Sequence, residues 1–293
     1  MLRILLLGKN GQLGWELHRA LLTLGEVRAY DSPEIDLTKD HFIATIRSYR
    51  PQLIVNAAAY TAVDRAESEA EAATAINTRA PGILAEEAAK LGAALIHYST
   101  DYVFDGAKGS DYIETDAPNP LSAYGRSKLG GERAIQKVGG IYLILRTSWV
   151  YSTRRDSFVT KVLQWARQQT TLRVAADQVS NPTWARSLAE ASAQILAKAG
   201  ADTSAWLGER SGVYHLAGSG RASRLEWAEA ILRLDPRKEE QIVKEIQPAQ
   251  SAEFRTPAVR PLHSALNCDK FVHTFDLQLP DWREALKLAL ESP

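Results

Sequence analysis

The chain has 293 residues, enough for one large domain or two modest ones, and 45% hydrophobic against 24% charged residues excludes collagen-like and disordered classes. Because 35 Lys and Arg residues balance 35 Asp and Glu residues, we expect no basic surface for nucleic acid or anionic membranes. The single cysteine, Cys268, excludes an intramolecular disulfide. No apolar run reaches the roughly 18 residues of a membrane-spanning helix, and the first apolar run stops at Gly8, which is too early for a signal peptide. We therefore expect a soluble, cytoplasmic protein.

Short apolar runs alternate with helical patterns in the first half of the sequence. The runs of strand length are Ile4–Leu7, Val27–Tyr30, Leu53–Val55, Ala94–Tyr98 and Tyr142–Leu145. The helix-like stretches are Leu13–Leu24, Phe42–Tyr49, Glu69–Leu91 (interrupted by Pro81) and Ser122–Lys137. Apolar strands that alternate with helices are typical of a parallel sheet covered on both faces. The sequence therefore predicts a doubly wound α/β (Rossmann) sheet, with ligands at the carboxyl ends of its strands.

The pattern loosens after about residue 150 and predicts a smaller C-terminal α/β lobe. Helices are expected at Phe158–Gln168, Arg186–Ala199, Arg224–Leu234 and Asp281–Leu290, and strand-like segments at Leu172–Ala175 and Gly212–Leu216. We expect a dinucleotide-binding domain at residues 1–150, to which 155–176 and 212–218 are added. The substrate-binding lobe is expected at 177–211 and 219–293.

A glycine motif follows the first predicted strand and opens the first predicted helix. Gly8, Gly11 and Gly14 are spaced G-x-x-G-x-x-G, which fits either a plain strand-to-helix turn or a dinucleotide site. The position directly after an N-terminal strand favours the dinucleotide, because glycines allow close backbone approach and a helix N-terminus offers free N–H groups to a pyrophosphate. Asp31, at the end of the second predicted strand, is either a loop-starting acid or the acid that binds ribose hydroxyls and disfavours a 2′-phosphate.

A tyrosine and a lysine share one face of the predicted helix at 122–137. Tyr124 and Lys128 stand at i and i+4, where an ammonium can stabilise a phenolate and hold a ribose hydroxyl. This pair alone is a weak signal, but Thr100 ends the fourth predicted strand at the edge where a nicotinamide would lie. A hydroxyl, a phenol and an ammonium together can stabilise a carbonyl oxygen that becomes an alkoxide.

The sequence resembles a known family over nearly its whole length. The motifs that carry the resemblance are GKNGQLGWE at 8–16, VNAAAYTAVD at 55–64, HYSTDYVF at 97–104, RTSWVY at 146–151 and RTPAVRPLHSALN at 255–267. They resemble the extended short-chain dehydrogenase/reductases and, within them, the dTDP-4-dehydrorhamnose reductase family. The resemblance implies NADH- or NADPH-dependent reduction of the C4 ketone of dTDP-4-dehydro-L-rhamnose to dTDP-L-rhamnose.

The resemblance also implies roles for individual residues. Tyr124 would be the proton donor, Lys128 its partner, and Thr100 would tune the phenol. The cofactor would contact the glycine motif and the ends of several strands, at Gly8, Gly11, Gln12, Leu13, Gly14, Asp31, Asp36, Leu37, Ala59, Tyr60, Thr61, Tyr98, Tyr124 and Lys128. The sugar nucleotide would contact Thr100, Asp101, Tyr102 and Trp149. Because a diphosphate needs a cation, Arg260 is a further candidate for substrate binding. From the residues alone, Trp149 fits a sugar-facing indole or a core tryptophan equally, and Arg260 fits a phosphate contact or a solvated surface residue equally.

Two other functions remain open from the sequence. An epimerase or 4,6-dehydratase of the same extended family would also use Thr, Tyr and Lys, but a dehydratase resembling the family pattern would carry Asp-Glu after the threonine, where this chain has Asp101 and Tyr102. A non-catalytic regulatory subunit of the same fold need not keep Tyr124 and Lys128 together.

The expected assembly departs from part of the family. Some of these reductases dimerise through Mg²⁺ held by glutamates; Glu16 matches one of them, but Arg186 occupies the place of another. A guanidinium cannot ligate Mg²⁺, so we expect no metal. Either both residues are solvated in a monomer, or Arg186 pairs with Glu16 of a second subunit in a metal-free homodimer.

Overall fold

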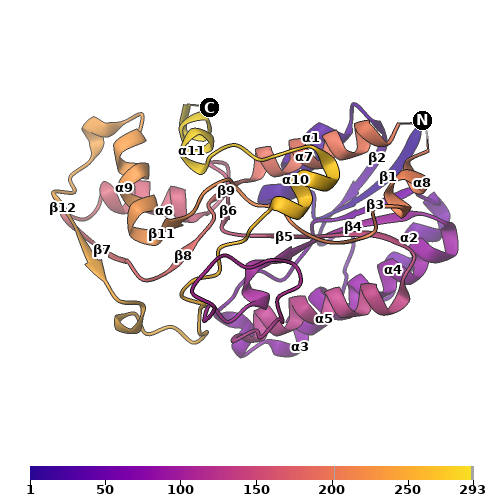
Figure 1. The fold of residues 1–293 in the computed structure, drawn as a ribbon, viewed down its shortest axis with the longest axis horizontal. Helices are drawn as coiled ribbons and strands as arrows, with labels where there is room; N and C mark the ends of the chain where they lie inside the picture. Colours follow the sequence, from indigo (N-terminus) through magenta and orange to yellow (C-terminus); the bar gives the residue numbers. More distant parts are fainter. Residues whose placement is uncertain (201, 292–293) are drawn as a thin grey trace.

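The computed structural model describes residues 1–200 and 202–291. Its main sheet has six strands, all paired in parallel, in the order β10-β5-β4-β3-β1-β2 (Figure 1). These strands are β1 (Leu2–Leu7), β2 (Gly25–Tyr30), β3 (Leu53–Asn56), β4 (Ala94–Thr100), β5 (Ile141–Thr147) and β10 (Gly212–His215). The chain passes from β1 to β2 on one side and to β3 on the other, which makes the carboxyl edge beside β1 a ligand-binding crevice.

Helices cover both faces of this sheet. One face packs against α1 (Gln12–Leu21), α7 (Ala185–Ala199), α8 (Thr203–Gly208) and α10 (Asp269–Phe275). The other packs against α2 (Phe42–Tyr49), α4 (Ala80–Leu91) and α5 (Ala123–Val138), on the opposite side in Figure 1. The central strands are buried because both faces are covered. The prediction of a doubly wound parallel sheet is confirmed.

Pro81 does not interrupt the helical segment in which it lies. The short helix α3 (Ala70–Thr74) continues through a π-helical turn, η2 (Ala75–Arg79), directly into α4, and Pro81 stands in the first turn of α4. Proline lacks the N–H that a regular turn requires, and the wider π-helical turn just before it relieves this requirement. The expected break is therefore a local widening of one nearly continuous helix.

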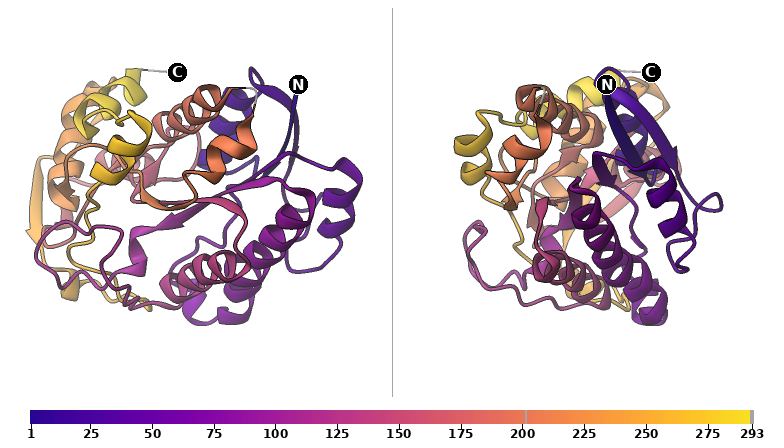
Figure 2. Two further views of the ribbon diagram at one scale, coloured as in Figure 1. Left: turned by 45° about the vertical axis from the view of Figure 1, so that its right-hand side comes forward. Right: turned by 90° about the vertical axis from the view of Figure 1, so that its right-hand side faces the viewer.

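A second lobe lies beside the carboxyl edge of the main sheet (Figure 2). It contains three two-stranded sheets, β6–β9, β8–β11 and β7–β12. Its strands are β6 (Val150–Tyr151), β7 (Thr171–Ala175), β8 (Val179–Ser180), β9 (Thr183–Trp184), β11 (Ala222–Ser223) and β12 (Glu245–Ala249). Its helices are α6 (Phe158–Ala166), α9 (Arg224–Leu234) and α11 (Trp282–Glu291), and these enclose a core of their own. Short 3₁₀ turns lie at η1 (Arg65–Glu67), η3 (Asp101–Val103), η4 (Lys238–Glu240) and η5 (Ser251–Glu253).

Two assignments made from the sequence are wrong. Segment 155–176 does not join the main sheet, because β7 pairs with β12 and the buried faces of α6 and β7 pack in the core of the second lobe. Segment 177–211 does not belong wholly to that lobe, because α7 packs on α1 and on the main sheet. Both errors concern which neighbour covers an apolar face, which local periodicity does not encode. Segment 212–218 does supply a strand, β10, at the edge beside β5.

Within residues 1–200 and 202–291, no helix combines the length and the apolar character needed to cross a membrane.

Candidate active site

A cavity of about 800 Å³ runs along the carboxyl edge of the main sheet and continues under the second lobe. Its size suits a ligand as large as a dinucleotide or a sugar nucleotide. Most of the residues expected at the site line it: Gly8, Gly11, Gln12, Leu13, Asp31, Asp36, Leu37, Ala59, Thr61, Tyr98, Thr100, Asp101, Tyr102, Tyr124, Lys128 and Trp149. Gly14, Tyr60 and Arg260 are not among the lining residues.

The glycine turn presents the start of α1 to this cavity. Gly8 has φ +86°, and a Cβ on Gly14 would stand 1.8 Å from the Gly8 carbonyl oxygen, so the turn closes tightly where side chains are absent. Gly14 therefore packs the turn rather than lining the cavity. Gly11 caps α1 with no side-chain hydrogen bond from the described residues, which leaves backbone N–H groups of the first turn free for an anion. This geometry fits the pyrophosphate of a dinucleotide.

Asp31 faces the glycine turn from the end of β2. Its carboxylate accepts hydrogen bonds from the backbone N–H of Asn10 at 2.8 Å and of Ser32 at 2.8 Å. The nearby cation of Lys9 is paired with Glu34 at 2.6 Å. The negative charge of Asp31 at the cavity is thus fixed in place, and the closest ammonium in sequence is already neutralised.

Tyr124 and Thr100 come together where α5 meets the end of β4. Ser122 caps α5 by accepting the Gly125 N–H at 3.1 Å, and a Cβ on Gly125 would stand 2.3 Å from the Tyr102 carbonyl oxygen. The glycine therefore lets the helix approach η3 closely, which places Tyr124 near Thr100. Burial raises the pKa of the Tyr124 phenol, an effect that the neighbouring Thr100 hydroxyl partly offsets, so the phenol keeps its proton at neutral pH.

Lys128 lies one turn further along α5 and is 2% exposed. Its Nζ donates to the Tyr98 carbonyl oxygen at 2.6 Å and lies 3.4 Å from Nε2 of His97. Burial lowers the pKa of Lys128 to about 8, while Glu132 opposes the shift. The side chain is therefore held beside the cavity with a proton that it can release near neutral pH.

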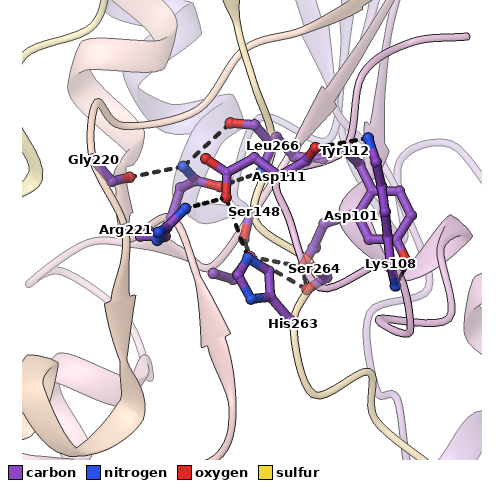
Figure 3. Close-up of polar contacts among 12 residues, drawn as sticks. Asp101, Lys108, Asp111, Tyr112, Ser148, Gly220, Arg221, His263, Ser264 and Leu266 are labelled. Atoms are coloured by element: carbon purple, nitrogen blue, oxygen red, sulfur yellow. Dashed lines mark hydrogen bonds and ion pairs between the residues drawn. The ribbon is translucent and has the colours of Figure 1, made fainter. Parts of the chain in front are cut away.

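Asp101 is a buried carboxylate surrounded by hydroxyl groups. Ser264 donates to it at 2.5 Å, and Ser148 lies within the same cluster (Figure 3). Ser180 and Thr100 each donate to it at 3.1 Å. Burial raises the pKa of Asp101, although all these hydroxyls stabilise its charged form. Because Ser180 and Ser264 belong to the second lobe, this cluster joins the two lobes at the floor of the cavity.

Arg224, at the first position of α9, is a lining residue that sequence reasoning did not identify. Its guanidinium lies 3.6 Å from the ring centre of Trp149, and the neighbouring Tyr102 and Asp101 favour its charged form. Trp149 has φ +43°, an uncommon value for a residue with a side chain, and its ring stacks on Trp227 at 5.4 Å. Burial lowers the pKa of Arg224 to about 10, so the group stays cationic at neutral pH. A helix-capping pattern in the sequence predicts the start of α9, but no local signal shows that its first side chain turns into the cavity.

Two of the expected residues that do not line the cavity make other contacts. Tyr60 donates from its hydroxyl to Glu69 at 2.5 Å. Arg260 forms an ion pair with Asp64 at 2.7 Å and its side chain is 22% exposed, so it is not a solvated surface residue.

Glu16 and Arg186 meet within one chain, at 3.4 Å. Glu16 is 9% exposed, so the expected alternative in which both residues are solvated is wrong for Glu16. The contact forms because α1 and α7 pack side by side, and the pairing between two subunits stays a prediction. Among the described residues, no group of three or more His, Cys, Asp and Glu side chains is arranged to hold a metal ion.

Comparisons with known proteins agree with this geometry. A family model described as "RmlD substrate binding domain" matches residues 2–292. The dTDP-4-dehydrorhamnose reductase of Burkholderia thailandensis is 42% identical to this chain, and the alignment covers 99% of the chain and 98% of the relative. That of Escherichia coli K12 is 41% identical, with 99% and 97% covered.

Solved structures show the same relationship. A dTDP-4-dehydrorhamnose reductase from Clostridium acetobutylicum superposes with a TM-score of 0.89 at 32% identity, covering 99% of this chain and 98% of the other. One from Bacillus anthracis, in complex with NADP, superposes with a TM-score of 0.88 at 30% identity, covering 100% and 99%. A UDP-glucose 4-epimerase from Thermus thermophilus, at 21% identity and a TM-score of 0.78, shares the fold. The protein therefore belongs to the RmlD substrate binding domain family, together with the dTDP-4-dehydrorhamnose reductases, and is a nicotinamide-dependent oxidoreductase.

Proposed function

We propose that this protein reduces the C4 ketone of dTDP-4-dehydro-L-rhamnose to dTDP-L-rhamnose with NADH or NADPH. One observation carries the proposal: Thr100, Tyr124 and Lys128 line the same cavity as the start of α1. No side chain of the described residues caps that helix start, so its N–H groups can bind a pyrophosphate. The names of the relatives supply the substrate class.

The chain's own residues account for the proton in this reaction. A bound reduced nicotinamide supplies the hydride. Tyr124, partly buried and protonated, donates its proton to the substrate oxygen as the negative charge develops there. The neighbouring Thr100 hydroxyl favours the phenolate that remains, and Lys128 lies on the same helix face, one turn away. The Asp-Glu pair expected of a dehydratase is incomplete, because Tyr102 stands where its second acid would be.

Turnover of dTDP-4-dehydro-L-rhamnose with each reduced cofactor tests the proposal directly. Oxidation of the cofactor and formation of dTDP-L-rhamnose in equal amounts is the expected result. An epimerase or dehydratase would instead purify with bound NAD⁺ and convert its substrate without net oxidation of added NADH. A protein with no turnover of any nucleotide sugar would fit the regulatory subunit.

Arg224 is proposed to bind the diphosphate of the sugar nucleotide. It is a cation on the substrate side of the cavity with no carboxylate partner among its described hydrogen bonds, whereas Arg260 is already paired with Asp64. Arg224→Met is expected to weaken dTDP binding by roughly 10- to 100-fold, since a hydrogen bond to a charged group contributes about 1.5–3 kcal/mol. Titration calorimetry with dTDP and with thymidine measures this, and thymidine affinity should change little.

The matched control is Arg221→Met, three residues before Arg224, because Arg221 is exposed and paired with Asp111 at 2.7 Å (Figure 3). It should bind dTDP as the unmodified protein does. If Arg224→Met also keeps its dTDP affinity, the diphosphate lies elsewhere.

The cofactor preference is expected to depend on Asp31. A fixed carboxylate at the end of β2 repels a 2′-phosphate, so NADH should bind at least as well as NADPH, with both accepted. Asp31→Asn is expected to shift the ratio of the two dissociation constants towards NADPH by roughly 5- to 10-fold, about 1 kcal/mol for like charges near the surface. Fluorescence titration with each cofactor gives the ratio, in which any general loosening of the glycine turn cancels. An unchanged ratio would mean that the 2′-position lies away from this carboxylate.

A further inference from the structure

Behind Lys128 lies a buried row of three polar side chains, two of which the reduction mechanism does not use. Asn56 at the end of β3 has its Nδ2 3.1 Å from Nδ1 of His97 on β4, and Nε2 of the same ring lies 3.4 Å from Nζ of Lys128. Asn56, His97 and Lys128 are each 2% exposed or less. Asn56 and His97 do not line the cavity, so their polar atoms must pair with one another or with Lys128, which alone of the three borders it.

The orientation of Asn56 is fixed from outside the row. Its Oδ1 accepts the backbone N–H of Ala58 at 3.2 Å, so its NH₂ group faces His97 and can only donate. Burial and the neighbouring Lys128 hold the pKa of His97 well below its usual range, so the ring is neutral and carries one N–H. With Nδ1 accepting from Asn56, that N–H is on Nε2 and points at Lys128.

This arrangement has one donor too many when Lys128 is an ammonium. With the proton on Nε2, the ring N–H faces the ammonium; with the proton on Nδ1, it faces the Asn56 NH₂. Turning the Asn56 amide over leaves the Ala58 N–H facing an NH₂ group. With Lys128 as a neutral amine, every contact is satisfied: Asn56 donates to His97, His97 donates to Nζ, and Nζ donates to the Tyr98 carbonyl oxygen.

We propose that His97, oriented by Asn56, is a positioning residue that poises Lys128 between its ammonium and amine forms. This inference rests on the proposed reductase activity and deepens it. Each reduction removes one proton from Tyr124; an ammonium at Lys128 can return that proton to the phenolate and become an amine, which His97 then stabilises until solvent restores its proton.

The other groups that face Lys128 do not produce this effect. Glu132, one turn along α5, favours the ammonium, but it is bound in a bidentate pair to Arg146 of β5 at 2.7 and 3.0 Å. The Tyr98 carbonyl on β4 accepts from either form of Lys128. The pKa of about 8 that burial gives Lys128 places both forms within reach at neutral pH.

Two substitutions test the proposal by moving the pH at which Lys128 loses its proton. In Asn56→Asp, the carboxylate accepts from Nδ1 of His97 and from Ala58, which turns Nε2 into an acceptor for the ammonium. In His97→Phe, the ring loses the N–H that stabilises the amine. In each variant, the pH above which kcat falls (the alkaline limb of the pH profile) should rise by about one unit. One pH unit corresponds to about the free energy of one buried hydrogen bond. The limb lies near pH 8 in the unmodified protein on this account, since activity falls as the ammonium is lost.

The pH dependence of NADH binding is the second readout, because it requires no turnover. Lys128 lines the cavity, so NADH affinity should change around the same pH and follow the same shifts in both variants. Ser192→Ala is the matched control: it removes a buried 2.7 Å hydrogen bond to the hydroxyl of Tyr98, next to His97 in β4, and should leave both limbs in place.

The outcomes separate this inference from the proposed function. Suppose that the unmodified protein reduces no nucleotide sugar, but that the pH at which its NADH affinity changes moves upward in both variants. Then the proposed substrate is wrong and the role of His97 holds. If turnover is normal and neither limb moves in a folded Asn56→Asp or His97→Phe variant, or the limbs move to lower pH, the inference is overturned.

Discussion

Replacing Tyr124 by phenylalanine is expected to slow hydride transfer by roughly 10²- to 10⁴-fold, the range that a positioned general acid contributes. The substitution removes the phenol oxygen and keeps the ring, which packs edge-on against Tyr102 at 5.9 Å. Binding of dTDP and of NADH should therefore change little. Single-turnover measurement of cofactor oxidation, with both ligands saturating, isolates this step.

Tyr112→Phe is a suitable control for the loss of a tyrosine hydroxyl. Its hydroxyl donates to Asp105 at 2.8 Å in a loop that does not line the cavity, so single-turnover rates should stay normal. Near-normal hydride transfer in Tyr124→Phe would show that another group protonates the substrate oxygen. A large loss of NADH affinity in that variant would mean that the phenol mainly positions the cofactor.

The sequence could predict the main sheet because its signals are local. Buried parallel strands such as Leu53–Asn56 are apolar throughout, and a glycine turn directly after the first strand limits what can follow it. The second lobe lacks such signals. Its strands are as short as two residues and pair with segments distant in sequence, as β7 does with β12. Periodicity can show that β7 is a strand but cannot show its partner.

The same limit applies to the site. Tyr124 and Lys128 are visible in the sequence because one helix presents both of them. The hydroxyl cluster around Asp101 joins Asp101 to residues that are 79 and 163 positions away in the chain. The contact between the Arg224 guanidinium and the Trp149 ring is likewise visible only in the folded structure. The buried row of Asn56, His97 and Lys128 is likewise drawn from three separate elements. Tertiary structure, not local spacing, places these groups.

The largest loss of stability is expected at a buried ion pair behind the site. Arg146 of β5 is bound in a bidentate contact to Glu132 of α5, with side chains 5% and 1% exposed, and its guanidinium lies 5.1 Å from the ring centre of Phe104. Removing one partner leaves the other charge buried alone, which typically costs about 3–5 kcal/mol. Arg146→Met should lower the free energy of unfolding by that amount.

Urea unfolding followed by circular dichroism measures this loss, and two further variants establish its cause. Arg65→Met removes an exposed partner of Glu69, with side chains 70% and 38% exposed, and should cost less than about 1 kcal/mol. The double variant Arg146→Met/Glu132→Met replaces both buried charges by apolar side chains of similar length and should recover much of the loss, because the cost comes from the stranded carboxylate and not from the missing contact. If the double variant is less stable than Arg146→Met, the pair itself stabilises the fold, and the cation over Phe104 matters more than the desolvation of Glu132.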